Sequence, residues 1–380
     1  MRTIDAAGLA IGDGHPTRIM GVLNVSKESP YKPSVFDDHA QAAAFVDEEL
    51  IGEGADIVDI GLESANKKFE VLSAEGELER LETALETVAS VSGDAVFSIE
   101  TRYHEVATAA LDGGFDMVND ICGFADPEMP RVCREYDVAV GKMASPPDLE
   151  RPGAVERPGD IYEALSQNGM TEKTIVDPAF GGWSEEKTVG DDRETFRRLP
   201  EFRSYGQPIL VSINRKNFLR EMAGRDTERA LPVSLAATAM AIDRGVHVVR
   251  THDVAETRDA AIVGDRFRRD RLRRTELGLE EVDVRTPEQA ARQLAALGAE
   301  ASHADGLVQR CYILREIPTP DVERLEAATD GSVGFARAAT GVDGLLYGSA
   351  SGLVDLCDRL SMADLGTRTA RILDAIATEL

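Results

Sequence analysis

The sequence has few cysteines, and none is in a metal-binding arrangement. Neither a Cys-x-x-Cys pair nor a histidine at ligand spacing accompanies them, which excludes a zinc ribbon and Cys/His metal catalysis. The segment 1–14 lacks the basic and apolar parts of a secretory signal, and no window approaches the roughly 20 apolar residues of a spanning helix. We therefore expect a cytoplasmic protein without a membrane partner, whose four cysteines are reduced core residues: Cys122, Cys133, Cys311 and Cys357.

Positive charge is also scarce. The 42 Lys and Arg residues face 68 Asp and Glu residues, which gives a net charge of −26, and only eight of the 42 are lysines. Such a charge repels phosphate backbones and anionic membranes, so we expect no nucleic-acid partner. An acidic, lysine-poor surface keeps a protein hydrated in concentrated salt. We interpret the composition as halophilic, and the alternative is an ordinary acidic protein.

The common nucleotide-binding and hydrolase motifs are absent. No Gly-x-Gly-x-x-Gly turn follows the first apolar run, and the sequence has no Gly-x-x-x-x-Gly-Lys-Ser/Thr loop. It also has no His-Glu-x-x-His sequence and no Gly-x-Ser-x-Gly elbow. These absences argue against dinucleotide binding, P-loop chemistry, zinc proteolysis and a serine nucleophile.

Short, β-branched apolar runs recur along the first two thirds of the chain, with amphipathic or Ala-rich segments between them. This alternation is typical of a parallel sheet covered on both faces. Repeating units of strand and helix within about 250 residues predict a (β/α)8 TIM barrel, and a doubly wound open sheet is the alternative. The predicted strands are Ile19–Asn24, Ile57–Gly61, Val96–Glu100, Met117–Ile121, Val138–Met143, Thr174–Pro178, Ile209–Ile213 and His247–His252.

The character of the chain changes near Arg268. We predict a barrel domain over residues 1–270 and a smaller, α-rich C-terminal extension over 271–380. Helices are expected at Glu288–Leu297, Thr319–Ala328 and Thr367–Glu379. No group of chemically active residues stands out in this extension. We interpret it as a packing or assembly module.

Polar residues end several of the predicted strands, where a TIM barrel carries its active site. An amide, a carboxylate and a lysine suit a flat heterocycle such as a pterin. Arginine and histidine on the eighth strand suit a diphosphate, and an asparagine on the neighbouring first strand suits Mg²⁺. Arg250 could instead form a salt bridge with Asp253 or Glu63. The strand-end residues are Asn24, Glu100, Asn119, Asp177, Lys216, Arg250 and His252.

In order and spacing, these strands resemble the dihydropteroate synthase family over roughly residues 18–268. The resemblance implies a TIM-barrel homodimer that joins 6-hydroxymethyl-7,8-dihydropterin diphosphate to para-aminobenzoate (4-aminobenzoate), with loss of diphosphate. The matching segments are Met20–Val25, Ile57–Gly61 with Glu63 and Ser64, Val118–Ile121, Val176–Pro178, Arg215–Lys216 and Arg250–Asp253.

The resemblance also assigns roles to residues of this chain. It implies that Asn119, Asp177 and Lys216 bind the pterin, with Met143 in the wall around it. Asn24 would contact the Mg²⁺ on the diphosphate. Arg250 and His252 would bind the diphosphate itself. The catalytic residues would be Glu100, Asp177 and Lys216.

Two loops and one strand end depart from the family pattern. The usual Ser-Thr-Arg-Pro is replaced by Ser64, Ala65, Asn66 and Lys67, which removes a threonine and an arginine that help bind the second substrate and diphosphate. The first loop is altered after Val25, and Glu100 replaces the family's aspartate. The alternatives are therefore a pterin-binding paralogue with another acceptor or no turnover, and a pterin-dependent methyltransferase module.

Overall fold

The computed structural model describes residues 1–25, 34–63, 71–149, 153, 155–181, 187–269, 271–274, 279–339, 341–361 and 363–380. They form two compact units, Met1–Glu280 and Glu281–Leu380, and each is described by itself. The boundary predicted from the sequence, after residue 270, lies ten residues before the boundary in the structure. In the described part of the chain, none of the helices combines the length and apolar composition needed to cross a membrane.

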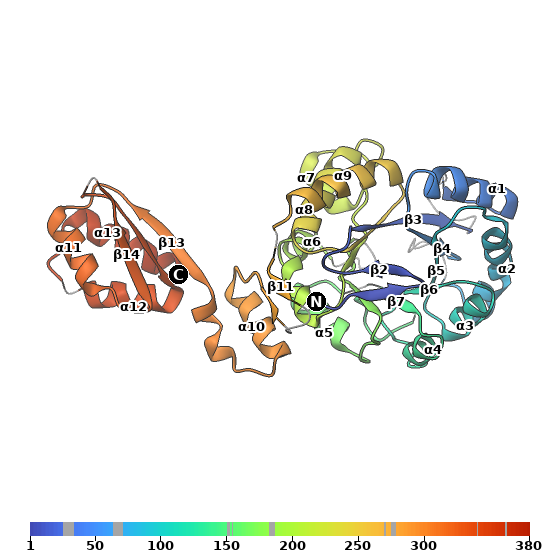
Figure 1. Cartoon of the computed structure of the whole chain (residues 1–380), viewed down its shortest axis with the longest axis horizontal. Helices are drawn as coiled ribbons and strands as arrows, with labels where there is room; N and C mark the ends of the chain where they lie inside the picture. Colours follow the sequence, from blue (N-terminus) through green and yellow to red (C-terminus); the bar gives the residue numbers. More distant parts are fainter. Residues whose placement is uncertain are drawn as a thin grey trace. The chain divides into compact units, whose positions relative to one another are not determined.

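The first unit is a barrel of parallel strands surrounded by helices (Figure 1). The eight-stranded sheet has the order β8-β7-β6-β5-β4-β3-β10-β9, and a bridge between Val176 and Ile209 joins its two outermost strands. The TIM-barrel prediction is confirmed, and each strand overlaps a predicted run. The strands are β3 (Arg18–Asn24), β4 (Ile57–Gly61), β5 (Val96–Thr101), β6 (Met117–Asp120), β7 (Ala139–Met143), β8 (Thr174–Asp177), β9 (Leu210–Val211) and β10 (Val248–Thr251).

Helices follow the strands and pack on the outside of the barrel. In the second of them, Ser73 caps the N-terminus by accepting a hydrogen bond from Gly76 N, while Leu81 and Ala84 are buried. The helices are α1 (His39–Phe45, continued by a π-helical turn Val46–Ile51), α2 (Ala74–Ser90), α3 (His104–Asp112), α4 (Met129–Glu135), α5 (Pro158–Ser166), α6 (Val189–Arg197), α7 (Asn217–Ala223), α8 (Leu231–Asp243) and α9 (Val254–Phe267).

A short hairpin, β1 (Ile4–Ala6) and β2 (Leu9–Ile11), closes the end of the barrel where the strands begin. The turn residues Ala7 and Gly8 both have positive φ, as a tight two-residue hairpin requires. The hairpin packs on one inward-facing apolar side chain from each barrel strand: Met20, Ile57, Val96, Met117, Ala139, Ile175, Leu210 and Val248. Sequence periodicity missed this hairpin because three-residue strands are too short to show an alternation.

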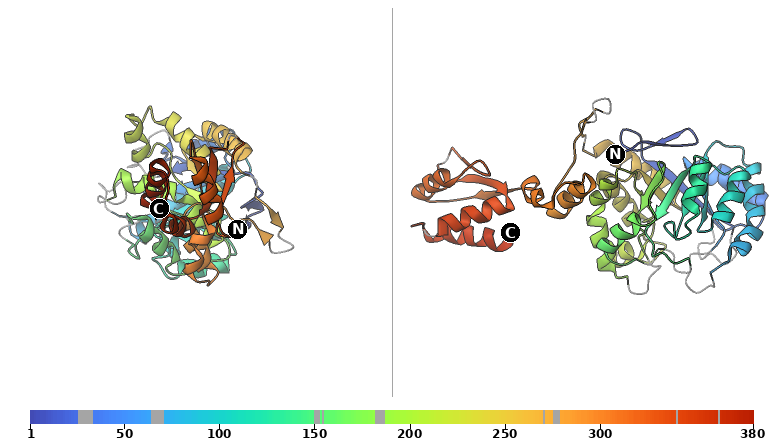
Figure 2. Two further views of the ribbon diagram at one scale, coloured as in Figure 1. Left: turned by 90° about the vertical axis from the view of Figure 1, so that its left-hand side faces the viewer. Right: turned by 90° about the horizontal axis from the view of Figure 1, so that it is seen from below.

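The second unit contains the predicted helices and also a sheet that the α-rich prediction did not include. Antiparallel strands β13 (Gln309–Leu314), β15 (Gly344–Ser349) and β14 (Val333–Arg337) lie in that order. Helices α11 (Thr319–Ala328), α12 (Ala350–Ser361) and α13 (Thr367–Glu379) share one core with this sheet and lie on one side of it (Figure 2). A smaller core surrounds α10 (Pro287–Ala296).

Glycines explain why the sequence pattern does not predict these strands. Gly334 and Gly344 lie where a Cβ would be 2.2 Å from the Tyr347 ring and 2.1 Å from the Phe335 ring, so aromatic side chains cross the neighbouring strand at these glycines. A strand that contains glycine and has one solvent-exposed face does not show a continuous run of apolar residues in the sequence. A further antiparallel pair of strands, β11 (Arg273–Arg274) and β12 (Leu279–Glu280), follows the barrel.

Candidate active site

Polar side chains gather at the ends of the barrel strands, two or four residues beyond the apolar layer that contacts the hairpin. Because side chains alternate along a strand, these positions face the inside of the barrel as well. A spacing of two residues separates the apolar residue from the polar one on three of the strands: Ile57 and Asp59, Met117 and Asn119, and Ile175 and Asp177. These strand-end residues, together with Lys216 at the start of α7, form what we call the barrel-mouth cluster: Asn24, Asp59, Glu100, Asn119, Asp177, Lys216, Arg250 and His252.

Arg250 joins three strands at the centre of this cluster. Its Nε donates to Asp59 Oδ2 at 2.7 Å, and its Nη2 donates to Glu100 Oε2 at 2.5 Å. Asn119 Nδ2 donates to the same Asp59 oxygen at 3.0 Å, while Asp59 Oδ1 is buried without a hydrogen-bond partner. Burial raises the pKa of Glu100, and the two carboxylates raise the pKa of Arg250 against its own burial.

The two salt bridges considered for Arg250 are made by other arginines. Arg215 forms a bidentate pair with Asp253, with both donor–acceptor distances at 2.8 Å. Arg102 pairs with Glu63. Arg250 therefore belongs to the interior of the barrel mouth and does not pair with these rim carboxylates.

Asp177 lies at the end of β8, and Lys216 lies at the start of α7. Asp177 Oδ1 accepts a hydrogen bond from Ala179 N at 2.8 Å, in a turn where Ala179 has a φ of 58°. Burial raises the pKa of Asp177 to about 6, and the charges of Lys216 and Arg250 oppose that rise. Burial, followed by the charge of Arg250, lowers the pKa of Lys216. The Lys216 side chain crosses Gly181, where a Cβ would lie 2.9 Å from Lys216 Cδ.

A buried lysine that sequence reasoning did not identify supports this turn. Lys187 Nζ donates to Ala179 O at 2.6 Å and pairs with Asp192 Oδ1 at 3.3 Å. Asp192 also accepts from Gly181 N at 3.3 Å. Lys187 follows no strand and belongs to no motif, so no sequence signal could have identified it.

Asn24 and His252 are linked through a serine. Asn24 Nδ2 donates to Ser34 Oγ at 3.2 Å, and Ser34 Oγ lies 3.2 Å from His252 Nδ1. Burial, followed by the charge of Arg250, lowers the pKa of His252 to about 3, so the imidazole is neutral near pH 7. The donor in the Ser34–His252 contact depends on the imidazole tautomer, and in the tautomer whose Nδ1 accepts from the serine hydroxyl the imidazole proton lies on Nε2.

Two further strand ends complete the described surroundings. Met143 is buried beside Asp177 in the register of β7 and β8. Gly141 leaves room for Asn119, because a Cβ at position 141 would lie 2.7 Å from Asn119 Oδ1. Asp120 faces outward and accepts from Cys122 N and Phe124 N, so it organises the following turn. The altered second-loop residues Ala65, Asn66 and Lys67 lie outside the described residues.

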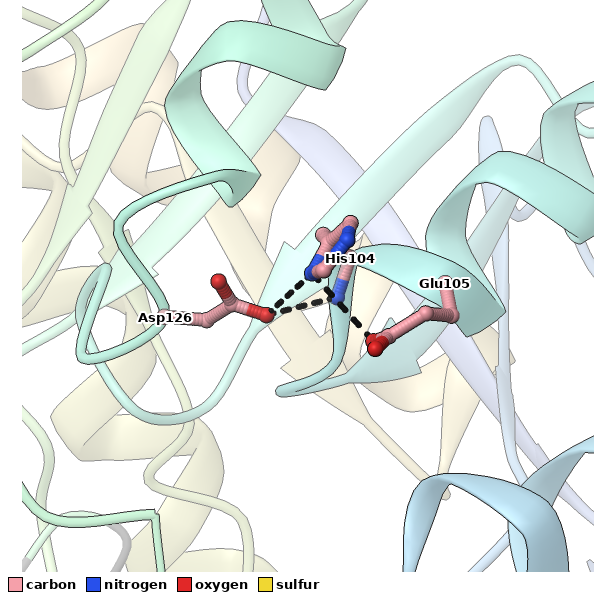
Figure 3. A group of neighbouring side chains, drawn as sticks. All are labelled: His104, Glu105 and Asp126. Carbon is pink, nitrogen blue, oxygen red and sulfur yellow. Dashed lines mark hydrogen bonds and ion pairs between the residues drawn. The ribbon is translucent and has the colours of Figure 1, made fainter.

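A separate group near the start of α3 has atoms spaced as metal ligands would be (Figure 3). His104 Nδ1 lies 2.7 Å from Asp126 Oδ2 and 3.2 Å from Glu105 Oε2. The same Asp126 oxygen accepts from His104 N at 3.0 Å, and Asp126 Oδ1 accepts from Glu128 N. These bonds are those of a helix cap, and they account for the group without a metal.

Comparison with known proteins gives this barrel a family. The family model described as "Pterin binding enzyme" matches residues 20–252. A dihydropteroate synthase of Clostridium beijerinckii is 30% identical over 259 residues, covering 66% of this chain and 94% of the relative. A solved dihydropteroate synthase of Coxiella burnetii, in complex with pteroic acid, is 28% identical with a TM-score of 0.59, covering 70% of this chain and 98% of that one.

A haloarchaeal relative is longer than this chain. A probable bifunctional folylpolyglutamate synthase/dihydropteroate synthase of Halobacterium salinarum is 32% identical over 268 residues, covering 67% of this chain. The chain spans about a third of the length of such haloarchaeal relatives, 32% in this case. The match with the family model and the near-complete coverage of the clostridial relative show that the chain belongs to the dihydropteroate synthase family of pterin-binding enzymes.

Proposed function

We propose that the chain condenses 6-hydroxymethyl-7,8-dihydropterin diphosphate with 4-aminobenzoate to give 7,8-dihydropteroate and diphosphate. The observation that carries the proposal is the barrel-mouth cluster, which brings Asn119, Asp177 and Lys216 together with Arg250 and His252 in a chain of this family. The test is to incubate the full chain with both substrates and Mg²⁺, then measure diphosphate release and identify dihydropteroate by mass spectrometry. Absence of both products from folded protein would overturn the proposal.

The carboxylate side of the cluster suits a pterin ring. Asp177 accepts one hydrogen bond through Oδ1, and an amino-pyrimidinone edge offers donors of the kind its second oxygen accepts. Asn119 uses its amide N–H on Asp59, so its Oδ1 is the atom available as an acceptor for the ring. Lys216 supplies a donor for a ring carbonyl. Each group would then meet the complementary edge of the heterocycle.

The oxygen donors beside Asn24 fit Mg²⁺. Since Asn24 Nδ2 is bound to Ser34, Oδ1 points to the other side, and a Cβ on Gly61 would lie 3.1 Å from it and 3.6 Å from Glu100 Oε1. The lack of a Cβ leaves a cradle between two hard oxygen atoms, which is the donor type that Mg²⁺ prefers. We propose that Asn24 holds the ion. When bound, Mg²⁺ would neutralise charge on the diphosphate.

Arg250 and His252 would act on the leaving group in different ways. Arg250 already donates to Glu100, so a diphosphate oxygen would replace that carboxylate at Nη2. Neutral His252 would donate through Nε2, as a hydrogen-bond donor without charge. Arg250 would therefore contact both the carboxylates of the cluster and the diphosphate. The cluster is not divided into one anionic half and one cationic half. Exchange of one anion for another at Arg250 avoids leaving its charge unpaired.

The reaction needs orientation and charge stabilisation from these residues. The bond between the methylene carbon and the diphosphate oxygen breaks while the amine nitrogen bonds to that carbon, and the electron-rich ring spreads the positive charge that develops. Carboxylates of Asp59, Glu100 and Asp177 stabilise that charge. A neutral aromatic amine is nucleophilic without a strong base, and the additional proton leaves the nitrogen after the new bond forms.

A pterin-binding paralogue with another acceptor, or with no turnover, is the second candidate. The substitutions at Ala65 and Asn66, together with Glu100, favour it because they alter the acceptor side and leave the pterin side intact. The same assay separates the two. Pterin binding without diphosphate release supports the paralogue, and release with a different amine supports an altered acceptor.

We also propose a homodimer that uses the outer faces of α8 and α9. These adjoining helices expose Met240, Ile262, Val263 and Phe267, whose exposed fractions are 49%, 54%, 52% and 82%. Clustered apolar side chains on a chain of net charge −26 favour association at that face. Light scattering after size exclusion tests this, with Val263→Glu as the variant expected to give monomers. A wild-type monomer would overturn the proposal.

We further propose that the protein is adapted to concentrated salt. Among the lysines that the structure describes, Lys142 and Lys187 are buried and donate to carbonyl oxygens. Arginine therefore provides most of the positive charge on the described surface, beside a large excess of carboxylates.

A further inference from the structure

Residues 179–181 form a turn that contacts two of the side chains assigned to the pterin. Ala179 N donates to Asp177 Oδ1 at 2.8 Å. The Lys216 side chain crosses Gly181, where a Cβ would lie 2.9 Å from Lys216 Cδ and 3.3 Å from Lys216 Nζ. Ala179 and Gly181 have φ values of 58° and 99°, in the left-handed region that favours glycine. An alanine stays in that region only when the surrounding contacts hold it there.

Helix α6 supplies some of the contacts that hold this turn. Asp192 and Phe196 are four residues apart, so they lie on the same face of the helix. Asp192 Oδ1 accepts from Gly181 N at 3.3 Å, and the centre of the Phe196 ring lies 6.1 Å from that of the Phe180 ring. Phe180 also stacks on Phe218 of α7, with ring centres 5.6 Å apart. The turn is therefore fixed against both helices.

Lys187 binds the same turn from the residue that precedes the cap of α6. Its Nζ donates to Ala179 O at 2.6 Å and lies 3.3 Å from Asp192 Oδ1, and its side chain is 1% exposed. Thr188 and Asp191 form a capping box, which fixes the direction in which the chain enters the helix. The helix dipole disfavours a cation at this end. The carboxylate of Asp192 and the carbonyl of Ala179 offset that cost.

The charge of Lys187 also acts on the pterin side of the barrel-mouth cluster. Burial raises the pKa of Asp177 to about 6. Three cations oppose that rise: Lys216, Arg250 and Lys187. Lys216 and Arg250 belong to the cluster, whereas Lys187 binds the backbone of the turn. A substitution of Lys187 therefore changes the charge near Asp177 without removing a group assigned to a substrate.

We propose that Lys187 is a positioning residue for the pterin ring, because it fixes the turn that contacts Asp177 and Lys216 and keeps a positive charge beside it. This inference rests on the proposed function, in which Asp177 accepts from the ring as a carboxylate. Without the Lys187 charge, Asp177 should gain its proton at a higher pH. Pterin affinity should then begin to weaken at a higher pH as well.

The test compares a variant and a matched control in the full chain. Lys187→Met keeps the length of the side chain and removes both the charge and the hydrogen-bond donor. Lys173→Met is the control, since Lys173 Nζ donates to Asp137 O at 2.6 Å and pairs with Asp137 Oδ2 at 2.9 Å. Asp137 also has a positive φ, 53°. Lys173 directly precedes β8 and so lies at the opposite end of the strand from Asp177.

Calorimetry from pH 5 to 8 measures the affinity for free hydroxymethyl-pterin. In Lys187→Met the midpoint of the pH dependence should lie about half a pH unit or more above that of the wild type, because a nearby cation favours the charged form of a carboxyl group. The control should keep the wild-type midpoint. Damage to the structure alone would lower the affinity at every pH and leave the midpoint in place.

Two further measurements support the comparison. The Ala179 amide, which donates to Asp177, should exchange its hydrogen faster in Lys187→Met than in the wild type and the control. Asp192→Asn keeps the lysine and an oxygen for Gly181 N but removes the negative charge, so it should move the midpoint to a lower pH. This second variant decides the question if Lys187→Met does not fold.

The outcomes separate this role from the proposed function. An unchanged midpoint in Lys187→Met, or in Asp192→Asn where the first variant does not fold, overturns the positioning role. Failure of the folded wild type to bind the pterin overturns the proposed function and the role of Lys187 with it. A wild type that binds the pterin and forms no dihydropteroate overturns the synthase reaction alone.

Discussion

Arg250 lies between two carboxylates, and a diphosphate that binds there as proposed would have to displace one of them. Asp59 is wholly buried and accepts from both Arg250 and Asn119, whereas Glu100 contacts Arg250 through a single oxygen. The Glu100 contact is therefore the one that a phosphate oxygen can replace without stripping a buried carboxylate of its partners.

The first prediction concerns this exchange. Arg250→Lys keeps a positive charge near Asp59 but loses the planar fork, so binding of the pterin diphosphate should weaken by about 1.5–3 kcal/mol, the range for hydrogen bonds to charged groups. Binding of the free hydroxymethyl-pterin should change much less. Calorimetry with both ligands, with and without Mg²⁺, measures the difference. Equal losses for the two ligands would contradict a role at the diphosphate. Arg250→Ala is unsuitable because an unpaired buried Asp59 costs about 3–5 kcal/mol of stability.

The second prediction concerns Asp177. Its pKa is raised to about 6, so the carboxyl gains a proton as the pH falls through 6, and pterin affinity should weaken between pH 7 and pH 5. Asp177→Asn should lower the affinity at pH 7 by about 1–3 kcal/mol, because an amide presents donors where acceptors are needed. The variant should lose the pH dependence seen in the wild type. Titration of a pterin analogue from pH 5 to 8 checks both, and a wild-type curve that parallels the variant's would remove Asp177 from the site.

The positions of these residues could be predicted from the sequence, whereas their partners could not. A polar residue two positions beyond an apolar one on a short strand must face the same interior, and this rule identified Asn119, Asp177 and Arg250. Which carboxylate meets Arg250 depends on strand tilt and on side-chain length. The sequence also offers Asp253 and Glu63 as partners for Arg250, yet Arg215 and Arg102 pair with them.

At the scale of elements, the loop after the N-terminal hairpin is attached to the barrel by one ionic group. Arg203 donates twice to Asp13, and His247 Nε2 lies 3.1 Å from Asp13 Oδ1. Ile209 N donates to His247 Nδ1, which fixes the remaining imidazole proton on Nε2. Burial acts to raise the pKa of Asp13. The hydrogen bonds and charges of His247 and Arg203 outweigh burial and hold the pKa of Asp13 well below its usual range.

The third prediction follows from this depressed pKa. Asp13 contributes stability that is complete above its unfolded-state pKa of about 3.9 and is lost as the pH falls towards its folded-state value. Asp13→Asn should lower the free energy of unfolding by about 2–4 kcal/mol at pH 7, since Arg203 keeps a neutral partner only. The difference between variant and wild type should shrink below about pH 4. Urea unfolding at pH 7, 5 and 3 measures it, and a constant difference would show that Asp13 does not titrate with folding.

The barrel strands were predictable because each is a buried run rich in β-branched residues. The N-terminal hairpin and the C-terminal sheet were not, for different reasons. The hairpin is defined by the turn at Ala7 and Gly8, and its two strands are too short for a pattern. In the C-terminal sheet, Gly334 and Gly344 occupy positions where larger residues would normally signal a strand.

At the scale of the whole molecule, negative charge is spread evenly over the two units. Residues 1–280 contain 52 acidic and 33 basic residues, and residues 281–380 contain 16 and 9. The excess of acid per residue is therefore almost the same in a barrel that carries the barrel-mouth cluster and in a unit without it. A shared property of this kind points to the solvent and not to a ligand of either unit.

Helix α2 shows how this charge acts locally. It exposes Glu75, Glu79, Glu82 and Glu86 along one side, and the pairs spaced by four residues repel each other. In the described part of the chain, Glu86 Oε2 lies 3.1 Å from His39 Nδ1, a neighbour that carries charge only when it is protonated. Screening by salt weakens such repulsion, because the Debye length falls from about 10 Å at 0.1 M to about 3 Å at 1 M. The same argument applies to the other carboxylates of the acidic surface.

The last prediction tests the proposed adaptation to salt. The melting temperature of the wild type should rise between 0.05 M and 2 M KCl, because the folded state concentrates like charges more than the unfolded chain does. Glu79→Gln/Glu82→Gln removes two of the repelling carboxylates and should melt at a higher temperature in dilute buffer, with a smaller rise on adding KCl. Sucrose, which favours compact states without screening charge, is the control that separates the two effects. A melting temperature that stays flat or falls with KCl, or that rises equally in wild type and variant, means that charge screening is not the cause and the acidic surface needs another explanation.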